Sequence, residues 1–196
     1  MNQSHVAMSP AQAIEFSVPE PTGLRRNDVE ALAENIAAQM GYLPGADIFS
    51  AVVEAGGRVD YKDYWDSKNI DSGSLVVYGE GNFEIFLSTE TSHLRDKFTV
   101  AHELGHYVLH YLYPRQVLSK PINYLKADRY GTNKTEWEAN WFAAAFLMPK
   151  RKFTNDFRSA QGRIREVSEL FGVSESAVKI RARSLGLTHK DDEKEE

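Results

Sequence analysis

Two histidines and a glutamate near the middle of the chain have the types and spacing of a hydrolytic metal site. His102, Glu103 and His106 form the pattern H-E-x-x-H. On an α-helix, residues four apart lie roughly 40° apart around the axis and about 6 Å apart along it, so both imidazoles can reach one ion. Zinc accepts imidazole nitrogen and leaves one position open to water, whose pKa it lowers from about 15.7 towards 7. Glu103, beside the pair, can then take a proton from that water.

A hydrolytic zinc site needs a third protein ligand, for which three downstream residues are candidates. His110 lies about 12 Å beyond His102 on a straight helix, too far to share an ion, so we expect it to pack or to support a ligand. Glu136 shares a helix face with Asn140, whose amide can hydrogen bond to a ligand. Glu138 is rotated about 200° from Glu136 and should point elsewhere. We therefore predict Glu136 as the third ligand and Asn140 as its support.

The surrounding patterns predict the elements that must hold these residues. The apolar residues around H-E-x-x-H recur at helical spacing, and Pro114 should end that helix. Helices are also predicted over 27–41, 48–53 and 136–148, and strands over 58–61, 75–78 and 83–87. The strand 83–87 alternates apolar and polar residues like a half-buried edge strand, to which an extended peptide could add. The predicted fold class is α+β.

Composition narrows the class of protein. The chain has 196 residues, 42% of them hydrophobic, enough for one principal core. A net charge of −5 argues against a wholly basic nucleic-acid-binding protein. Because cysteine is absent, a metal must be held by His, Asp or Glu. The sequence shows neither a long apolar run nor a signal peptide, so we expect a cytoplasmic protein without membrane contact.

The chain is expected to divide into four parts. These are a mobile N-terminal arm over 1–22, a core with the metal motif over 23–149, a helical segment packed on the core over 150–188, and an acidic, disordered tail over 189–196. Between 150 and 183 there are nine Lys or Arg residues and four acids. Gly172 separates two helical patterns there, and Ser174 can cap the second, as in a helix-turn-helix. The modest local charge favours packing or protein docking over DNA reading.

Two motifs resemble those of the ImmA/IrrE-type metallopeptidases. Residues 95–101 read R-x-x-F-T-x-A directly before H-E-x-x-H, and residues 136–149 read E-x-x-A-N-x-F-A-A before an apolar stretch ending in M-P. The resemblance runs from about residue 28 to 187. It implies a zincin-like fold, with a small, mostly antiparallel sheet packed on the motif helix and helix-turn-helix-like C-terminal helices. It also implies zinc, or manganese, on His102, His106 and Glu136, with Glu103 catalytic.

Three hypotheses about function follow. The leading one is a cytoplasmic zinc endopeptidase, for which the resemblance implies a regulatory protein as substrate, often a helix-turn-helix repressor encoded nearby. The second is a DNA- or partner-binding regulator in which the metal site is structural or vestigial. The third is a component of a toxin–antitoxin or phage-immunity pair, in which partner binding matters more than turnover.

Overall fold

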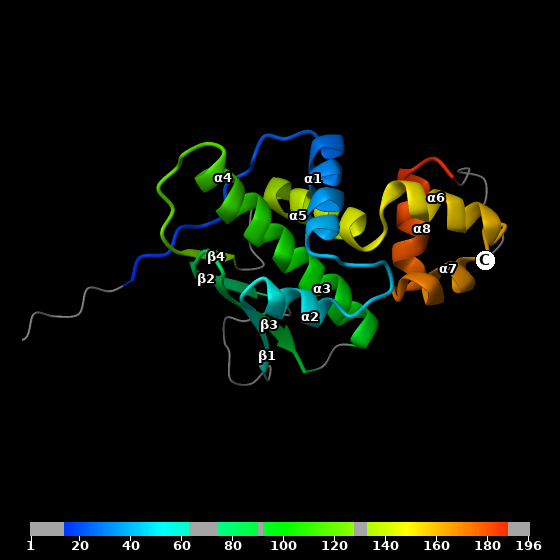
Figure 1. Cartoon of the computed structure of the whole chain (residues 1–196), viewed down its shortest axis with the longest axis horizontal. Coiled ribbons are helices and arrows are strands. Elements are labelled where there is room, and N and C mark those ends of the chain that lie inside the picture. Colours follow the sequence, from blue (N-terminus) through cyan, green and yellow to red (C-terminus); the bar gives the residue numbers. More distant parts are fainter. Residues whose placement is uncertain (1–13, 63–73, 90–91, 128–132, 188–196) are drawn as a thin grey trace, which may run out of the picture.

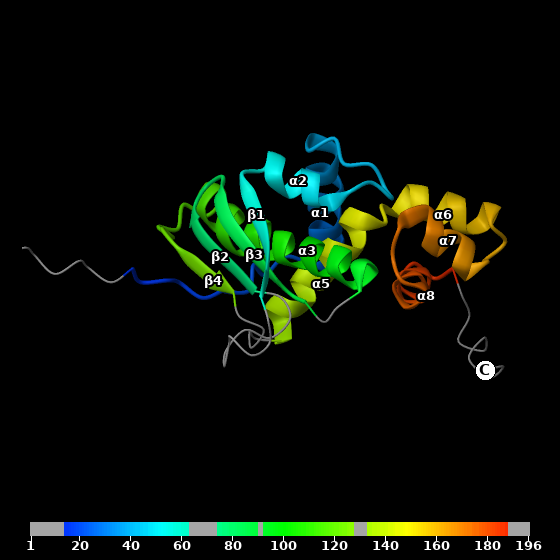
Figure 2. The ribbon, with the colours of Figure 1, turned by 90° about the horizontal axis from the view of Figure 1, so that it is seen from below.

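The computed structural model describes residues 14–62, 74–89, 92–127 and 133–187. It is an α+β structure in which a four-stranded mixed sheet packs on a layer of helices, with a group of C-terminal helices at one end (Figures 1 and 2). The strands are β1 (Gly57–Lys62), β2 (Ser74–Gly79), β3 (Asn82–Ser88) and β4 (Leu125–Ala127). The helices before the sheet are α1 (Arg26–Gln39) and α2 (Ile48–Glu54). Those after it are α3 (His93–His106), the π-helix η2 (Tyr107–Leu112), α4 (Tyr113–Gln116), α5 (Asn133–Leu147), α6 (Lys150–Ser159), α7 (Ile164–Phe171) and α8 (Glu175–Ser184).

The sheet has the strand order β1-β3-β2-β4. β1 runs parallel to β3, whereas β2 is antiparallel to both β3 and β4. The predicted strands are confirmed, but the expectation that 83–87 forms an edge is wrong, because β3 lies between β1 and β2. Phe86, on the face expected to be polar, is buried as well as Phe83 and Ile85. The parallel pairing with β1 is a long-range contact that local alternation does not show.

Three helices form the layer behind the sheet. α3 packs against β2 and β3 on one side and against α5 on the other, and α5 in turn contacts α1. At the crossing of α3 and α5, a Cβ added to Gly105 would lie 3.2 Å from the backbone oxygen of Ala139 and 3.2 Å from Cβ of Phe142. Glycine at 105 therefore lets the two helices approach closely. This contact sets the spacing between the motif helix and the helix that carries Glu136.

The motif helix does not end at Pro114 as expected. It continues through η2 into α4, and Pro114 lies at the first positions of α4. Pro114 has no N–H to donate to the preceding turn, so one hydrogen bond is missing there, and the continuous helix ends soon after, at Gln116. The ring of Tyr107, at the start of η2, stacks on Phe83 of β3 with 4.1 Å between centroids. The long helix is thus fixed to the centre of the sheet.

The N-terminal segment is held to the core where the structure describes it. Ser17 donates its N–H to Tyr124 O at 3.0 Å and accepts from the N–H of Lys126 at 2.9 Å, and the N–H of Thr22 donates to Glu138 at 2.9 Å. These bonds tie Ser17 and Thr22 to the core, although both residues belong to the segment 1–22 that was expected to be a mobile arm. Residues 1–13, and the tail expected over 189–196, lie outside the described residues.

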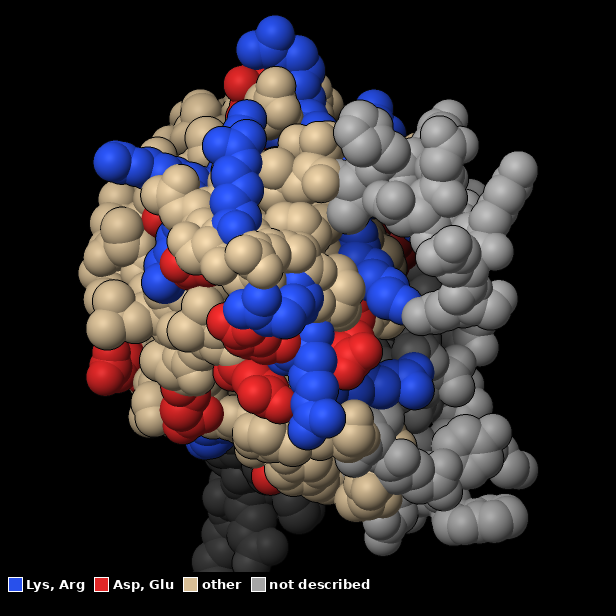
Figure 3. All heavy atoms as spheres, turned by 90° about the vertical axis from the view of Figure 1, so that its right-hand side faces the viewer, with Lys and Arg blue, Asp and Glu red and all other residues tan. Residues whose placement is uncertain are grey.

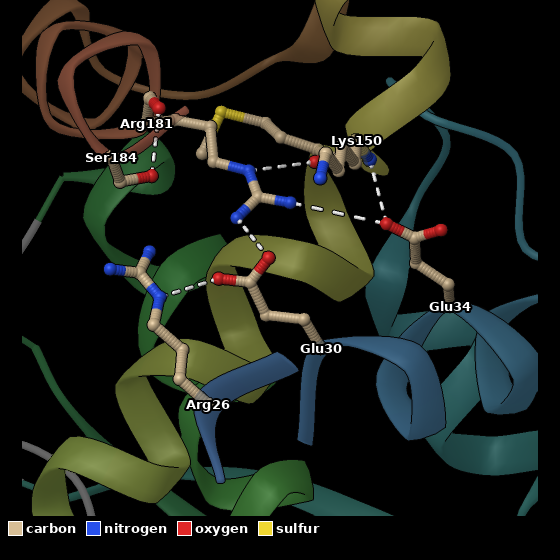
Figure 4. Close-up of polar contacts among 7 residues, drawn as sticks. Arg26, Glu30, Glu34, Lys150, Arg181 and Ser184 are labelled. Atoms are coloured by element: carbon tan, nitrogen blue, oxygen red, sulfur yellow. Dashed lines mark hydrogen bonds and ion pairs between the residues drawn. The ribbon is translucent and has the colours of Figure 1, made fainter. Parts of the chain in front are cut away.

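The C-terminal helices α6, α7 and α8 dock on the core through buried cations. Arg181 of α8, with a side chain 0% exposed, donates through Nε to Met148 O at 3.1 Å and pairs with Glu30 of α1 at 2.9 Å (Figure 4). Lys97 of α3 donates to Phe171 O, at the end of α7, at 3.2 Å. Gly172 follows in the left-handed region with φ 59°. Across the described residues, no helix is long and apolar enough to cross a membrane.

Candidate metal centre

Two helices bring the three predicted ligands together. His102 and His106 lie one turn apart on α3, and Glu136 lies in the first turn of α5. The two histidine Nε2 atoms are 3.1 Å apart. Glu136 reaches both rings, with Oε2 3.2 Å from Nε2 of His102 and Oε1 3.3 Å from Nε2 of His106. One donor atom from each residue lies within 4.8 Å of the others.

This donor set fits a tetrahedral metal ion. Ligand bonds of about 2.0–2.1 Å place two tetrahedral ligands about 3.3 Å apart, close to the 3.1 Å between the histidine nitrogens. Imidazole and carboxylate are also the donors expected of a catalytic zinc site. The side chains of His102 and Glu136 are 15% and 23% exposed, whereas that of His106 is 3% exposed. The centre is therefore closed behind His106 and reachable from solvent on the side of the other two ligands.

The environment of each ligand sets its protonation. Burial lowers the pKa of His106 to about 4, although the hydrogen bond to Glu136 acts in the opposite direction. Burial by itself raises the pKa of Glu136, but the two histidine rings beside it lower the pKa well below its usual range. For His102, burial lowers the pKa, but Glu136 and the charge of Glu103 outweigh it and raise it. At neutral pH the site thus offers a carboxylate and a neutral His106 to a cation.

Asn140 and Glu103 lie where the sequence placed them relative to the histidines. Oδ1 of Asn140, one turn after Glu136 on α5, is 3.1 Å from Nδ1 of His102. A proton on Nδ1 donated to Asn140 leaves the Nε2 lone pair of His102 facing His106 and Glu136. Glu103 follows His102 on α3 and is 5% exposed. It is thus a buried carboxylate beside the donor set.

His110 and Glu138 have partners that the sequence did not indicate. Nδ1 of His110 lies 3.0 Å from Nδ1 of His106, and its Nε2 lies 3.1 Å from Oε2 of Glu138. His110 thus contacts a ligand rather than the metal position, in agreement with the supporting role left open for it. Glu138 does point away from the three donors, but to His110 rather than to solvent. The spacing of four between His106 and His110 was the available signal.

Comparison with known proteins places these residues in a family. Residues 56–183, more than half of the chain, match the model of a peptidase family described as the IrrE N-terminal-like domain. The match includes the H-E-x-x-H motif, Glu136, and the helices up to α8. No curated protein matches the sequence significantly.

A solved structure described as a Mycobacterium tuberculosis transcriptional regulator is similar in fold. It has a TM-score of 0.54 and 18% sequence identity, and the similarity covers 78% of this chain and 45% of that chain. This chain therefore spans less than half the length of that structure. At this identity the likeness concerns the fold alone.

Proposed function

This chain belongs to the ImmA/IrrE family of metallopeptidases, and on that premise we propose that it is a zinc-dependent endopeptidase that cleaves a regulatory protein. The observation that carries the proposal is the convergence of His102, His106 and Glu136 on one position. We assign these three residues as the metal ligands, Glu103 as the catalytic base, and Asn140 as the residue that orients His102. The α+β fold is, on this account, a zincin-like one, and manganese is the alternative metal.

The residues divide the chemistry among them. Zinc held by the three ligands supplies a Lewis acid that polarises the scissile carbonyl and acidifies water. Glu103 accepts the proton of the attacking water on its carboxylate and then gives it to the leaving amine. Its burial, with 5% exposure, keeps competing solvent away from this proton. Asn140 holds the ring of His102 so that Nε2 keeps its lone pair towards the metal position.

The proposed substrate is a helix-turn-helix repressor encoded near the gene of this chain. The resemblance of the two sequence motifs to ImmA/IrrE-type enzymes supports this substrate class. The fold similarity to a structure described as a transcriptional regulator is consistent with a regulatory setting. A peptidase with a single regulatory target needs docking contacts beyond the metal centre, so general protein substrates should be cleaved poorly or not at all.

Intact-mass analysis of the candidate repressor tests this proposal. The repressor is incubated with the wild-type chain and zinc, with manganese in a parallel sample, and with Glu103→Gln as the control. We expect two fragments whose masses add up to the repressor plus one water with the wild type, and the uncut repressor with Glu103→Gln. Cleavage that survives in Glu103→Gln contradicts the assigned base. An uncut repressor with the wild-type chain contradicts the substrate.

A DNA-binding function is the second candidate, favoured by the arrangement of α7 and α8. Gly172 ends α7 in the left-handed conformation, and Ser174 caps α8 by accepting from the N–H of Ala177 at 3.2 Å, as in a helix-turn-helix. The charge of this unit argues against it. Basic and acidic side chains are interspersed on the face that α6–α8 present (Figure 3). Ion pairs between these side chains include Lys152–Asp156, Arg163–Glu166 and Arg165–Glu169.

Arg181 adds a second argument against DNA reading, because it is buried against the core and cannot reach a phosphate or a base. The measurement that separates the two functions is the salt dependence of binding to the promoter of the candidate repressor. Binding that weakens steeply between about 50 and 200 mM salt, without cleavage of the repressor, would favour the DNA-binding function. The absence of such binding, with cleavage, favours the peptidase.

A further inference from the structure

A chain of buried polar groups extends behind His106, on the side away from the metal position. Nδ1 of His106 lies 3.0 Å from Nδ1 of His110, and Nε2 of His110 lies 3.1 Å from Oε2 of Glu138. The same carboxylate oxygen accepts the N–H of Thr22 at 2.9 Å. The side chains of His110 and Glu138 are both 0% exposed. The chain therefore joins a metal-centre histidine to a carboxylate inside the core.

The partners fix where the protons of this chain lie. Oε2 of Glu138 accepts the N–H of Thr22 at 2.9 Å and faces Nε2 of His110 at 3.1 Å, which is the geometry of a carboxylate oxygen that accepts from both. His110 must then donate through Nε2, and in a neutral ring this leaves Nδ1 as an acceptor. The proton between the two rings therefore sits on Nδ1 of His106. Its Nε2 keeps a lone pair, which faces His102 and Glu136.

The local backbone puts His110 in reach of His106. η2 begins at Tyr107, directly after the second histidine of the motif. In a π-helix each N–H bonds to the carbonyl five residues back, so the turn is wider than in an α-helix. The ring centroids of His106 and His110 are 4.9 Å apart, close to the 4.8 Å between His102 and His106. Three imidazoles thus follow one another along the helix, and only the first two face the metal position.

Burying the polar chain of His106, His110 and Glu138 costs free energy that a purely structural role does not explain. A buried carboxylate costs free energy unless its oxygens are hydrogen bonded. Oε1 of Glu138 has no hydrogen-bond partner among the described residues. Apolar side chains of similar volume at 110 and 138 would fill the same space without this cost. The polar chain is better explained by what it does to His106.

We propose that His110 and Glu138 are positioning residues for the metal centre, which hold His106 in the tautomer and orientation that present Nε2 to the metal. The inference rests on the proposed function in taking His106 as a ligand. Through His110, the carboxylate of Glu138 also makes Nε2 of His106 a stronger electron-pair donor to the metal. An acceptor bonded to the far nitrogen of a metal-bound histidine has this effect. His102 obtains the same kind of support from the amide of Asn140, which is neutral and exposed. The two ligands are therefore held by acceptors of different strength.

Zinc affinity of the metal-free chain, measured by competition with a chromophoric chelator, tests the proposal. His110→Phe fills the space but offers no acceptor to Nδ1 of His106, and we expect zinc affinity to fall about 10–100-fold. His110→Asn places an amide oxygen near the former Nδ1, so it should recover part of that loss. Both variants remove the imidazole that donates to Glu138, so a difference between them reports the acceptor rather than general destabilisation. Arg181→Met, in a separate buried network, is the control and should bind zinc as the wild type does.

A second measurement observes the tautomer without metal. Two-bond ¹⁵N–¹H correlation spectra of the imidazoles of the wild-type chain should show His106 protonated on Nδ1, and His110→Phe should shift it towards a mixture of tautomers. The proposal is overturned if His106 carries its proton on Nε2 in the wild type, or if a folded His110→Phe binds zinc within about twofold of wild type. A wild-type chain that binds no zinc while showing the Nδ1 tautomer instead identifies the proposed function as the part that fails.

Discussion

Two buried polar networks lie in different parts of the described chain, and they differ in the source of their positive charge. In the network that anchors α8, Arg181 brings a guanidinium to Glu30, which also pairs with Arg26 at 2.7 Å (Figure 4). In the metal centre, the lone pairs of two imidazoles and a carboxylate point towards one position. The first network contains its own cation, whereas the donors of the second are arranged to receive one. The difference suggests a structural role for Arg181 and a chemical one for His102, His106 and Glu136.

The largest expected effect is a loss of catalysis, which a change at the metal centre should cause and a change in the Arg181 network should not. Glu103→Gln should lower kcat for the cleaved repressor by about 10²–10⁴-fold, because the amide cannot accept a proton. The amount of bound zinc should not change, since Glu103 is not a ligand. Arg181→Met, assayed below its melting temperature, should keep the wild-type kcat. Equal losses in both variants would show that activity follows stability and not the assigned base.

For the stability of the fold, the larger effect is expected in the network that contains Arg181. Arg181→Met removes the buried cation beside Glu30 and the donor of Met148 O, so the free energy of unfolding should fall by about 3 kcal/mol. Arg165→Met is a matched control, because the pair Arg165–Glu169 is 84% and 67% exposed and should contribute little. Urea unfolding of the metal-free proteins, with helicity as the signal, measures both. A loss as small as that of the control would mean that the guanidinium does not anchor α8.

Zinc itself should stabilise only through the metal centre. At a free concentration about 100 times its Kd, zinc should stabilise the wild type by about 2.7 kcal/mol, which raises Tm by roughly 5–10 °C for a chain of this size. Glu136→Gln should lose this shift, while Arg181→Met should show it from a lower starting Tm. Thermal scans with and without a chelator make the comparison. A shift that persists in Glu136→Gln would point to zinc binding elsewhere.

A smaller effect is expected at the helix crossing that spaces the donors. A methyl group at 105 meets Ala139 O and Phe142 Cβ at 3.2 Å, so Gly105→Ala should push α5 away from α3 by a few tenths of an ångström. Overpacking of this kind costs about 1–3 kcal/mol, and Glu136 moves with α5. We expect both a lower Tm and a weaker zinc affinity. A variant with lower Tm but unchanged zinc affinity would show that the spacing at Gly105 does not control the donor geometry.

A further expected effect is a pH dependence of the metal-free protein. Burial lowers the pKa of His106 to about 4, so between about pH 6.5 and about pH 4 the unfolded chain holds a proton on this residue that the folded chain lacks. The stabilising contribution of neutral His106 is therefore present above about pH 6.5 and is lost as the pH falls. His106→Gln should show a shallower decline of stability over this range. The pKa of His102 is raised, so its contribution to stability grows as the pH falls. This contribution is present in both proteins.

The parts of the fold and site that follow local periodicity could be predicted from the sequence. The spacing of His102 and His106 on a helix, and of Glu136 and Asn140 on another, names the residues that the structure brings together. Strand positions were visible for the same reason, but their order was not, because β1 and β3 pair in parallel across a long connection. The short strand β4 and the helix α6 were not anticipated. β4 has only three residues, too few to show an alternation, whereas Phe153 and Phe157, four apart, are the helical signal that α6 does carry.

The buried networks could not be predicted, because they depend on contacts between elements far apart in the sequence. Arg181 counts as one basic residue among nine in its segment, and only its contacts with α1 and Met148 show that it is inside. Glu138 was set aside because it faces away from Glu136 around α5. Its role depends on the π-helical turn that brings His110 beneath His106, and local periodicity does not signal that turn.

The most direct test of the central claim is the zinc content of the chain. Native mass spectrometry of the wild type and Glu136→Gln, after equilibration at the same free zinc concentration, gives the number of ions bound per chain. The account predicts one zinc on the wild type and little or none on Glu136→Gln, with both proteins folded. A wild-type chain without zinc, or a Glu136→Gln chain that binds it equally well, would contradict the assignment of His102, His106 and Glu136 as a metal centre.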